Sequence, residues 1–302
     1  MIIKNNEAKL IEIYMYICDF YEKELKFHCQ RFSNNDKPEF TDQEVLTIYI
    51  YSIYHEQRFK CKQIHTFAKD YLISWFPKLH SYAAFNNRIN RLASVFPVLT
   101  NHLLNSYIPM DCVIETSLLD SMPIITSSGK RKGKVATELT DKGYCSTKNL
   151  YYHGVKLHAL SYHRKGHLPH PEQLLLTSAS ENDLNVFKQA WSNIEDRTFF
   201  GDKIYKNDVF FEQIMVTKNS IMLTPIKGIK NQSDFDKNFN RAYNDLYSKA
   251  VSTIRQPIES LFNWLIEKTD FQKANKVRST KGLIVHVFGR IAAAYFYLIF
   301  NP

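Results

Sequence analysis

Three acidic residues of this chain, Asp120, Asp202 and Glu259, have the types and settings of ligands for divalent metal ions. Asp120 ends the largely apolar run 113–120 and Asp202 ends the short run 198–202, whereas Glu259 lies in a segment, 255–262, with the pattern of a helix. Mg²⁺ prefers hard oxygen ligands, and two such ions about 3.5–4 Å apart can activate a nucleophile and stabilise the leaving oxygen of a phosphodiester. The three residues therefore predict a two-metal site for phosphodiester chemistry.

Each acidic residue also has a simpler interpretation. Asp120 could form an Asx turn, Gly201-Asp202 is an ordinary turn dipeptide, and Glu259 could face solvent on its helix. Arg255 favours the metal-site interpretation because it lies four positions before Glu259, on the same helix face. A guanidinium there could hold a phosphate oxygen or orient the glutamate carboxylate. We therefore expect the three acids to be catalytic metal ligands and Arg255 to contact the phosphate of a nucleic acid.

Pro257 falls between Arg255 and Glu259 and complicates a single helix across this segment. A proline inside a helix removes a hydrogen bond and clashes with the preceding turn. The alternative is that Pro257 is the first residue of a new helix, which would put Glu259 in the first turn of that helix.

A basic run follows the first aspartate closely and comprises Lys130, Arg131, Lys132 and Lys134. Runs of this kind are usually solvated loops, but one beside a phosphoryl-transfer site could neutralise the phosphates of a nucleic acid. We predict that these four residues contact DNA phosphates, as does Lys203, the neighbour of Asp202.

Lys156 and His158 alternate with apolar residues along a predicted strand, so both lie on one face of that strand. We predict that this face looks toward the acidic residues, where the two side chains could contact DNA. Three further histidines surround a predicted hairpin turn and are expected to be exposed there: His163, His167 and His170.

The second part of the chain alternates predicted strands with predicted helices. The predicted strands are Cys112–Leu119, Leu150–Ser161, Gln173–Ser178, Arg197–Gly201 and Ile221–Thr224, and the predicted helices are Asp183–Asn193, Asn207–Val216, Arg241–Lys268 and Thr280–Phe300. Three strands followed by alternating helices and strands is the order of the ribonuclease H-like fold. We therefore predict an α/β catalytic domain over residues 107–302, with a mixed five-stranded sheet flanked by helices.

Residues 1–106 are predicted to be all helical, with helices over Asn5–Phe32, Lys60–Trp75 and Ser81–Tyr107. A further helix is expected to begin after Thr41, because Thr41-Asp42-Gln43-Glu44 has the pattern of a capping box. Compact helices before a catalytic domain predict a helix-turn-helix-like DNA-binding region. A purely structural or dimerising bundle is the alternative.

Composition sets broader limits on this chain of 302 residues, whose length suggests about two domains. Its net charge of +9 favours a polyanionic partner such as DNA, although the same composition could reflect an A/T-rich genome. Five cysteines without a Cys-x-x-Cys pair argue against a disulfide framework and favour a reducing cytoplasm. The apolar tail 291–300 is too short to span a bilayer and predicts a buried helix, so no membrane partner is expected.

Six short sequence motifs occur in order along the chain: LDSMP (119–123), YHGVKLH (152–158), SEND (180–183), GDKIY (201–205), LTP (223–225) and RQPIE (255–259). Together they resemble the DDE transposases of bacterial insertion sequences, and most closely the insertion sequence 982 group. The resemblance runs over nearly the whole chain and is strongest from about residue 112 to residue 302.

The resemblance implies a ribonuclease H-like fold and a transposase that acts on DNA at the bacterial nucleoid, in the cytoplasm. It implies two Mg²⁺ ions, for which Mn²⁺ could substitute, held by Asp120, Asp202 and Glu259. Activated water would cleave a phosphodiester at each terminal inverted repeat, and the freed 3′-hydroxyl would attack target DNA by in-line transesterification. A homodimer or higher assembly is expected because two ends must be joined. The alternatives are a purely hydrolytic ribonuclease H-like nuclease and a domesticated or inactive DNA-binding protein.

Two positions depart from the pattern of related transposases. Those proteins often carry a tyrosine three residues before the arginine and a basic residue seven after the glutamate, where this chain has Ser252 and Ile266. These departures weaken the carry-over of a DNA-hairpin mechanism to this chain.

Overall fold

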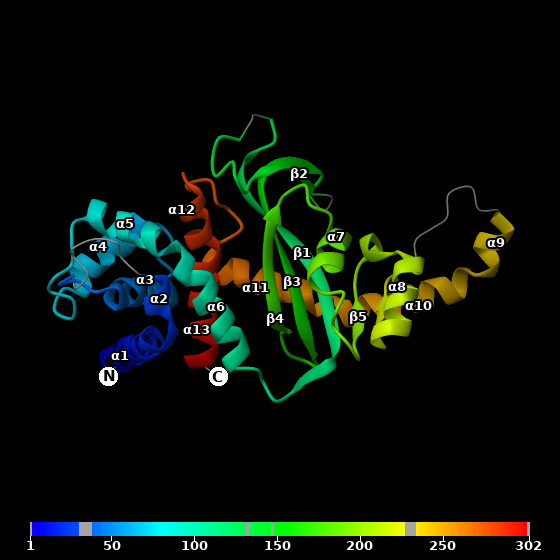
Figure 1. Ribbon diagram of the computed structural model, residues 1–302, viewed down its shortest axis with the longest axis horizontal. Coiled ribbons are helices and arrows are strands. Elements are labelled where there is room, and N and C mark those ends of the chain that lie inside the picture. The colour runs from blue at the N-terminus through cyan, green and yellow to red at the C-terminus, as the bar shows by residue number, and fades with distance from the viewer. Residues whose placement is uncertain (1, 30–37, 131–132, 146–147, 227–233, 301–302) are drawn as a thin grey trace. The chain divides into compact units, whose positions relative to one another are not determined.

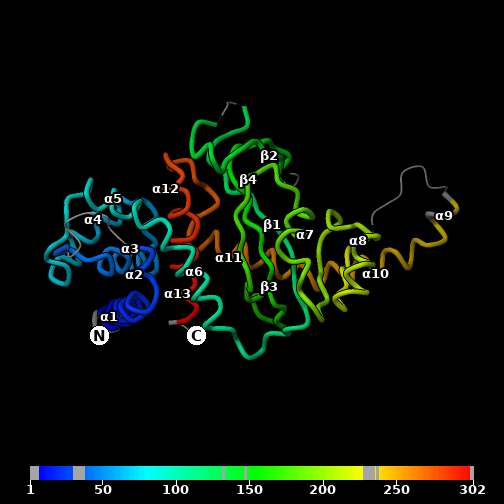
Figure 2. Tube along the Cα trace, in the orientation of Figure 1, coloured from blue at the N-terminus to red at the C-terminus, as the bar shows by residue number. Residues whose placement is uncertain are grey.

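The computed structural model describes residues 2–29, 38–130, 133–145, 148–226 and 234–300 (Figure 1). The chain divides into two compact units. Unit 1 comprises residues 1–107, 134–139 and 265–302, and unit 2 comprises residues 108–133 and 140–264. The described part of unit 1 is helical, whereas unit 2 contains the sheet with its helices (Figure 2).

Unit 2 is built on one mixed sheet, to which the described residues contribute six strands: β1 (Cys112–Ser128), β2 (Asp141–Cys145), β3 (Leu150–Arg164), β4 (His170–Ser178), β5 (Thr198–Phe200) and β6 (Ile221–Leu223). β3 lies antiparallel to β1 and β4, while β5 runs parallel to both β1 and β6. The resulting order β4-β3-β1-β5-β6 confirms the predicted ribonuclease H-like α/β fold.

β1 is longer than predicted, because it continues past Asp120 to Ser128 along β3. Pro123 lies within this extension. Beyond Leu118, β1 has no pairing with β5 among the described residues, so a proline there need not interrupt a ladder on that side. The close approach of β1 and β3 also requires Gly154, since a Cβ there would lie 2.0 Å from the Ile124 carbonyl oxygen.

β2 was not predicted and adds a sixth strand to the five expected. It pairs with the first residues of β3, whereas β4 pairs with the later ones, so both occupy the same edge of β3. Its sequence, Asp141-Lys142-Gly143-Tyr144-Cys145, is short and lacks the alternation of apolar and polar residues that signals a strand.

The helical elements of unit 2 are α7 (Asp183–Ala190), the short turn η3 (Lys203–Tyr205), α8 (Asp208–Lys218), α9 (Asp234–Phe239), α10 (Arg241–Arg255) and the start of α11 (Pro257–Thr269). The core between α7, α8 and the sheet is aromatic, and its fully buried members include Phe187, Trp191 and Phe199. The Trp191 indole donates a hydrogen bond to Gln173 of β4 at 2.9 Å, which satisfies its only polar group.

Unit 1 contains α1 (Ile2–Phe20), η1 (Tyr21–Leu25), α2 (Lys26–His28), α3 (Asp42–Glu56), α4 (Cys61–Tyr71), α5 (Tyr82–Arg91), η2 (Leu92–Ser94), α6 (Val95–Ser106), the end of α11, α12 (Thr280–Ile284), η4 (Val285–Gly289) and α13 (Arg290–Phe300). The predicted capping box opens α3. The Thr41 hydroxyl accepts from the Glu44 amide at 3.2 Å, and the Glu44 carboxylate accepts from the Thr41 amide at 2.5 Å.

The C-terminal helices form part of the core of unit 1. α13 contacts α3 and α6, and its residues from Ile291 to Phe296 are almost fully buried. The Tyr49 hydroxyl donates to the Val285 carbonyl at 3.2 Å, and Thr100 donates to the Phe288 carbonyl at 3.0 Å. The segment Thr280–Ile299 is apolar and long enough to cross a membrane, but 72% of its most apolar window is buried in the protein, as in a core helix.

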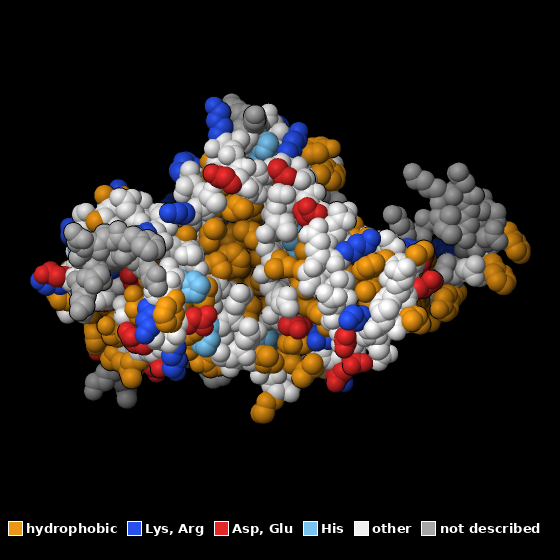
Figure 3. All heavy atoms as spheres, viewed as in Figure 1, with side chains coloured by type: hydrophobic (Ala, Val, Ile, Leu, Met, Phe, Trp, Pro, Cys, Tyr) orange, Lys and Arg blue, Asp and Glu red, His pale blue; other side chains and the backbone are white. Residues whose placement is uncertain are grey.

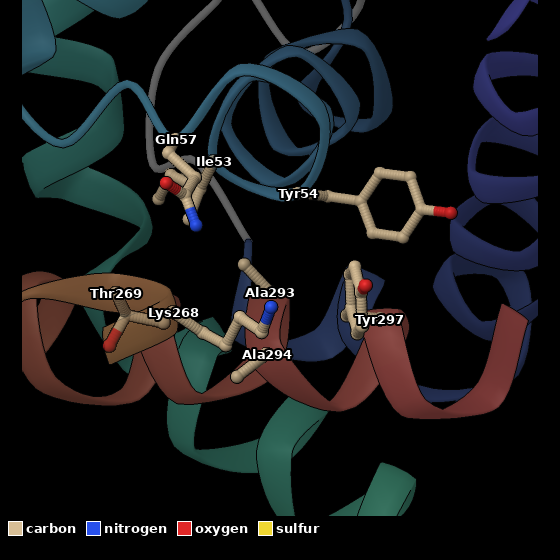
Figure 4. Close-up of a pocket in the computed structure, with 8 residues that line it drawn as sticks. All are labelled: Ile53, Tyr54, Gln57, Lys268, Thr269, Ala293, Ala294 and Tyr297. Carbon is tan, nitrogen blue, oxygen red and sulfur yellow. The ribbon is translucent and has the colours of Figure 1, made fainter. Parts of the chain in front are cut away.

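A small cavity lies between α3, the end of α11 and α13 within unit 1 (Figure 4). Its volume is about 20 Å³, room for roughly one water molecule. The Lys268 ammonium lies 4.6 Å from the centre of the Tyr297 ring on its wall. This cavity is too small for a substrate and does not define a functional site.

Candidate active site

Asp120, within β1, and Asp202, which follows β5, lie at matching positions beyond two paired strands of unit 2. The parallel ladder between β1 and β5 ends at the pair Leu118–Phe200, and each aspartate lies two residues further along its chain. The Ser121 amide donates to Asp120 Oδ1 at 2.8 Å. Each carboxylate is thus carried by rigid backbone at the end of one ladder.

Asp202 caps the short turn η3, in which the Ile204 amide donates to Asp202 Oδ1 at 2.8 Å. The preceding Gly201 lets the Tyr205 ring pack against the backbone, because a Cβ there would lie 2.6 Å from that ring. Tyr205 is almost fully buried. The glycine therefore sets the turn that orients Asp202.

Glu259 and Arg255 come from the junction of α10 and α11. α10 ends at Arg255 and α11 begins at Pro257, which confirms that the proline opens a new helix with Glu259 in its first turn. Arg255 Nη1 donates to Asp120 Oδ2 at 3.0 Å, and Nη2 donates to Glu259 Oε1 at 2.6 Å. One guanidinium therefore bridges the first and third predicted carboxylates.

The acidic residues perturb one another. Burial raises the pKa of Asp120 to about 6, with further raising by Asp202 and Glu259, while Arg255 and the Ser121 amide act in the opposite direction. Burial likewise raises the pKa of Asp202. Burial alone would lower the pKa of Arg255, but the carboxylates around it outweigh that effect and raise it. Arg255 is bonded to Asp120 and Glu259 but not to Asp202, so the three carboxylates have an excess of negative charge that favours binding of further cations.

A fourth carboxylate, Asp183, lies beside these residues and was missed in the sequence analysis. The Ser121 hydroxyl donates to Asp183 Oδ2 at 2.9 Å, and the Lys156 ammonium donates to Asp183 Oδ1 at 3.0 Å. Asp183 is the first residue of α7, after the cap Asn182, where an acidic residue is common for helix stability alone. The only sequence signal for a functional role of Asp183 was its place in the motif SEND (180–183).

Lys156 and His158 face the Asp183 carboxylate within the protein. Lys156 also donates to the Glu181 carbonyl at 2.7 Å, and its side chain is only 17% exposed. His158 is fully buried, with Nε2 2.8 Å from the Thr177 hydroxyl, and burial lowers its pKa to about 4. His158 is therefore neutral at pH 7, and in this conformation it has no surface for DNA.

The remaining residues predicted to contact DNA are exposed where the structure describes them. Lys203 is exposed next to Asp202, and Lys130 and Lys134 are exposed at either end of the basic run. Arg131 and Lys132 lie outside the described residues. Among the hairpin histidines, His167 is exposed as expected, but His170 is 6% exposed because it begins β4 rather than ending the turn.

The donor atoms of the site are carboxylate oxygens, which is the ligand type that Mg²⁺ prefers. The carboxylates also outnumber the cations bonded to them, so the site has the negative charge that attracts a divalent ion. Among the described residues, no group of three His, Cys, Asp or Glu side chains is arranged so that it could hold a metal ion. The Arg255 guanidinium lies between Asp120 and Glu259 instead. A metal held by both carboxylates would require Arg255 to release at least one of them.

Comparison with known families gives one match. The model of the family described as "Transposase DDE domain" matches residues 113–296, which is more than half of the chain. The matched segment includes Asp120, Asp202, Arg255 and Glu259. No curated protein and no solved structure matches the chain.

Proposed function

The chain belongs to the transposase DDE domain family, and from this premise we propose that it is the transposase of a bacterial insertion sequence of the insertion sequence 982 group. In this proposal it binds the terminal inverted repeats, cleaves a phosphodiester at each end and joins the freed 3′-hydroxyl to target DNA. Cys18, Cys61 and Cys112 carry free thiols, which suits action in the reducing cytoplasm, at the nucleoid.

The observation that carries the proposal is the convergence of Arg255 on Asp120 and Glu259, beside Asp202 at the matching register position. Asp120, Asp202 and Glu259 would hold two Mg²⁺ ions, or Mn²⁺ in their place, which would activate water and neutralise charge on the reacting phosphate. The Ser121 and Ile204 amides fix one oxygen of each aspartate. Arg255 would move from a carboxylate to a phosphate oxygen, for which its planar group is equally suited.

The exposed lysines supply the affinity for DNA in this proposal. Lys130 and Lys134, together with Arg131 and Lys132, contact DNA phosphates, and Lys203 contacts a phosphate beside Asp202. We assign Lys156 and His158 to the support of Asp183 rather than to DNA, because both are engaged inside unit 2.

We assign recognition of the transposon ends to the N-terminal helices, as a helix-turn-helix-like region over residues 1–106. α3 and α4 are joined by the four-residue turn 57–60, with Gln57 in the left-handed region at φ 48°, and this length is typical of a helix-turn-helix. α4 buries Ile64, Phe67 and Ala68. Its exposed residues could reach base edges and phosphates, and all but the aromatic Tyr71 are polar or charged: Lys62, Gln63, Thr66, Lys69, Asp70 and Tyr71.

A second copy of the chain is the proposed partner on DNA, because two ends must be joined. α9 and the first half of α10 carry a stripe of side chains that are at least two-thirds exposed: Phe235, Phe239, Tyr243 and Leu246. Figure 3 shows hydrophobic side chains along these helices. Exposed apolar stripes of this size commonly mark interaction surfaces. Sedimentation of a Phe239→Glu, Leu246→Glu variant on end DNA would report whether this stripe pairs two copies.

The test of the proposed function uses the purified full chain, Mg²⁺ and DNA that carries the terminal repeats flanking its gene. Wild-type protein should nick the ends and join them to a target plasmid. Asp120→Asn, Asp202→Asn and Glu259→Gln should each abolish both steps while binding persists. Asp111→Asn is the matched control, because Asp111 is an acidic residue of unit 2 that pairs with Arg164 instead.

Each outcome separates the proposal from its alternatives. Nicking without joining would identify a hydrolytic nuclease of the same fold. Binding without either step would identify a DNA-binding protein that has lost activity. Full activity of any of the three variants would remove that residue from the site.

A further inference from the structure

An open groove adjoins the acidic residues of unit 2. Its volume is about 400 Å³. One wall is a face of α10 formed by Ser248, Lys249, Ser252 and Arg255, whose spacing brings them together on one side of a helix. Asp202, Lys203 and Pro225 complete the lining. The groove therefore begins at two of the residues assigned to the active site and extends away from them along α10.

The cations of the groove lack acidic partners. Neither Lys203 nor Lys249 forms an ion pair with any residue that the structure describes, and both are exposed. Other lysines of unit 2 are paired, as Lys206 is with Asp208 and Lys218 is with Glu195. Two unpaired ammonium groups facing one groove are suited to an anionic ligand from outside the chain.

Hydroxyl groups lie between these cations. The Ser248 hydroxyl accepts a hydrogen bond from the Ile226 amide at 3.1 Å, so its own proton remains available for donation. No hydrogen bond joins the Ser252 hydroxyl to another described residue. Lysines and serines together are the side chains that commonly contact phosphate and sugar oxygens of DNA.

None of the seven described residues that line the groove, all named above, has an aromatic side chain. Proteins that hold an unpaired base usually stack it on Phe, Tyr, Trp or His, or on a guanidinium plane. Arg255, the one arginine among the described lining residues, has its guanidinium engaged by Asp120 and Glu259. The groove therefore has donors for a backbone but no free surface on which a base could stack.

We infer that this groove binds the sugar-phosphate backbone of the DNA strand next to the scissile phosphate, through Lys249, Ser252 and Lys203, and does not bind a base. This inference rests on the proposed function, since it concerns the DNA that the acidic residues would cleave. Its new content is the role of Lys249 and Ser252 and the form of DNA recognised. Recognition in the groove is accordingly independent of base sequence.

The test compares two kinds of modified end DNA, bound by the full chain in Ca²⁺ so that cleavage does not interfere. One series replaces single phosphates near the cleavage position by uncharged methylphosphonates, and the other removes single bases at the same nucleotides. At one or two neighbouring positions, methylphosphonate should lower affinity several-fold, whereas the abasic nucleotide should have little effect.

Variants connect this effect to the groove. Lys249→Ala should lower affinity several-fold and reduce the slope of log K against log salt by about 0.9, the value for one phosphate contact. Ser252→Ala should lower affinity by a smaller factor. At the sensitive phosphate, the methylphosphonate substitution should lower the DNA affinity of Lys249→Ala much less than it lowers the DNA affinity of the wild type. Lys165→Ala, an exposed lysine of the β3–β4 turn, is the matched control and should retain the wild-type sensitivity.

The failures of the two proposals are distinguishable. If wild type binds and cleaves the ends but Lys249→Ala behaves like Lys165→Ala, the groove inference is wrong and the proposed function stands. Sensitivity to the abasic nucleotide but not to methylphosphonate would likewise overturn it, in favour of a base in the groove. If wild type fails to bind end DNA at all, the proposed function and this inference are both overturned.

Discussion

Arg255 Nη1 lies 3.0 Å from Asp120 Oδ2, although the two residues are 135 positions apart in the sequence. The same guanidinium is bound to Glu259, so it acts as a monovalent counter-ion for two carboxylates that are proposed to hold metal ions. A divalent ion and Arg255 therefore compete for the same oxygens. Arg255 should therefore have two effects that can be measured separately: it lowers the affinity for the metal ion, and it supports strand cleavage.

Arg255→Gln should raise affinity for Mn²⁺ while it lowers strand cleavage. The gain should be at least about tenfold, since two unit charges about 4 Å apart interact by about 4 kcal/mol at an effective dielectric constant of 20. Titration calorimetry without DNA measures the affinity independently of activity. Arg255→Lys keeps the charge and should bind Mn²⁺ like wild type. Equal or weaker binding by Arg255→Gln would show that the guanidinium does not compete.

Asp183 should act as a positioning residue for Asp120. It holds the Ser121 hydroxyl at 2.9 Å, and the Ser121 amide in turn donates to Asp120 Oδ1. Asp183→Asn and Ser121→Ala should each lower Mn²⁺ affinity, by about 10- to 100-fold for the aspartate, as is typical of groups that orient metal ligands.

Asp141→Asn provides the matched control for that pair. Asp141 accepts hydrogen bonds from both the amide and the hydroxyl of Ser180, but it lies in β2 and contacts none of the acidic residues of the site. An unchanged Mn²⁺ affinity in Asp183→Asn, measured at wild-type thermal stability, would leave Asp183 with a purely structural role.

His286 should make unit 1 less stable in mild acid. Burial, and secondly Arg290, lower its pKa to about 3, while its Nε2 donates to the Phe271 carbonyl at 2.7 Å. Because the pKa is about 6.5 in the unfolded chain, the neutral histidine contributes stability that is complete above pH 6.5 and is lost as the pH falls from there toward 3. Between pH 7.5 and 5.5 this loss should be about 1.4 kcal/mol.

The measurement is urea unfolding at pH 7.5 and 5.5 for wild type and His286→Gln. Other histidines, such as the buried His158, titrate in both proteins, so only the difference between the two pH dependences reports on His286. The variant should lose about 1.4 kcal/mol less stability than wild type between these pH values. Parallel dependences would show that His286 does not couple to unfolding.

Local sequence was enough to predict the features that depend on neighbours in the chain. The capping box at Thr41, the helix start at Pro257 and the i, i+4 pair of Arg255 and Glu259 are all set within a few residues. The two aspartates were predicted from the apolar runs that precede them, and these runs contain the residues of β1 and β5 that pair in one parallel ladder.

Contacts between distant residues could not be predicted in the same way. Asp183 and Ser121 are 62 positions apart, and no period or spacing connects them. The alternation around His158 correctly gave it a polar face, but not its contacts with Thr177 of β4 and with Asp183 inside the protein. Burial depends on what packs over a strand, and that is a property of the whole fold.

Neutralising the basic run should weaken binding to all DNA sequences alike. Replacing Lys130, Arg131, Lys132 and Lys134 by alanine should reduce the slope of log K against log salt by about 0.9 for each phosphate contact that is lost. Fluorescence anisotropy over a range of salt concentrations gives this slope. Lys23→Ala, Lys26→Ala is the control, because these lysines pair with Asp19 and Glu22 on the protein surface. An unchanged slope would identify the run as a solvated loop.

A fragment of residues 1–106 should not fold cooperatively by itself, although it holds the proposed end-binding helices. In unit 1 the residues of α3 and α6 pack on η4 and α13, where a Cβ added at Gly289 would lie 2.8 Å from the Tyr49 ring and 3.1 Å from the Phe96 ring. Without residues 265–302, Tyr49, Phe96 and their neighbours would be exposed to water, at a cost of about 1.5–3 kcal/mol for each large apolar side chain.

Joining residues 1–107 to 265–302 through a flexible linker should restore a cooperative thermal transition by circular dichroism. Footprinting of end DNA should accordingly succeed with the joined unit 1 and fail with the short fragment. Stable folding of residues 1–106 alone would show that the C-terminal helices are not part of the folding core.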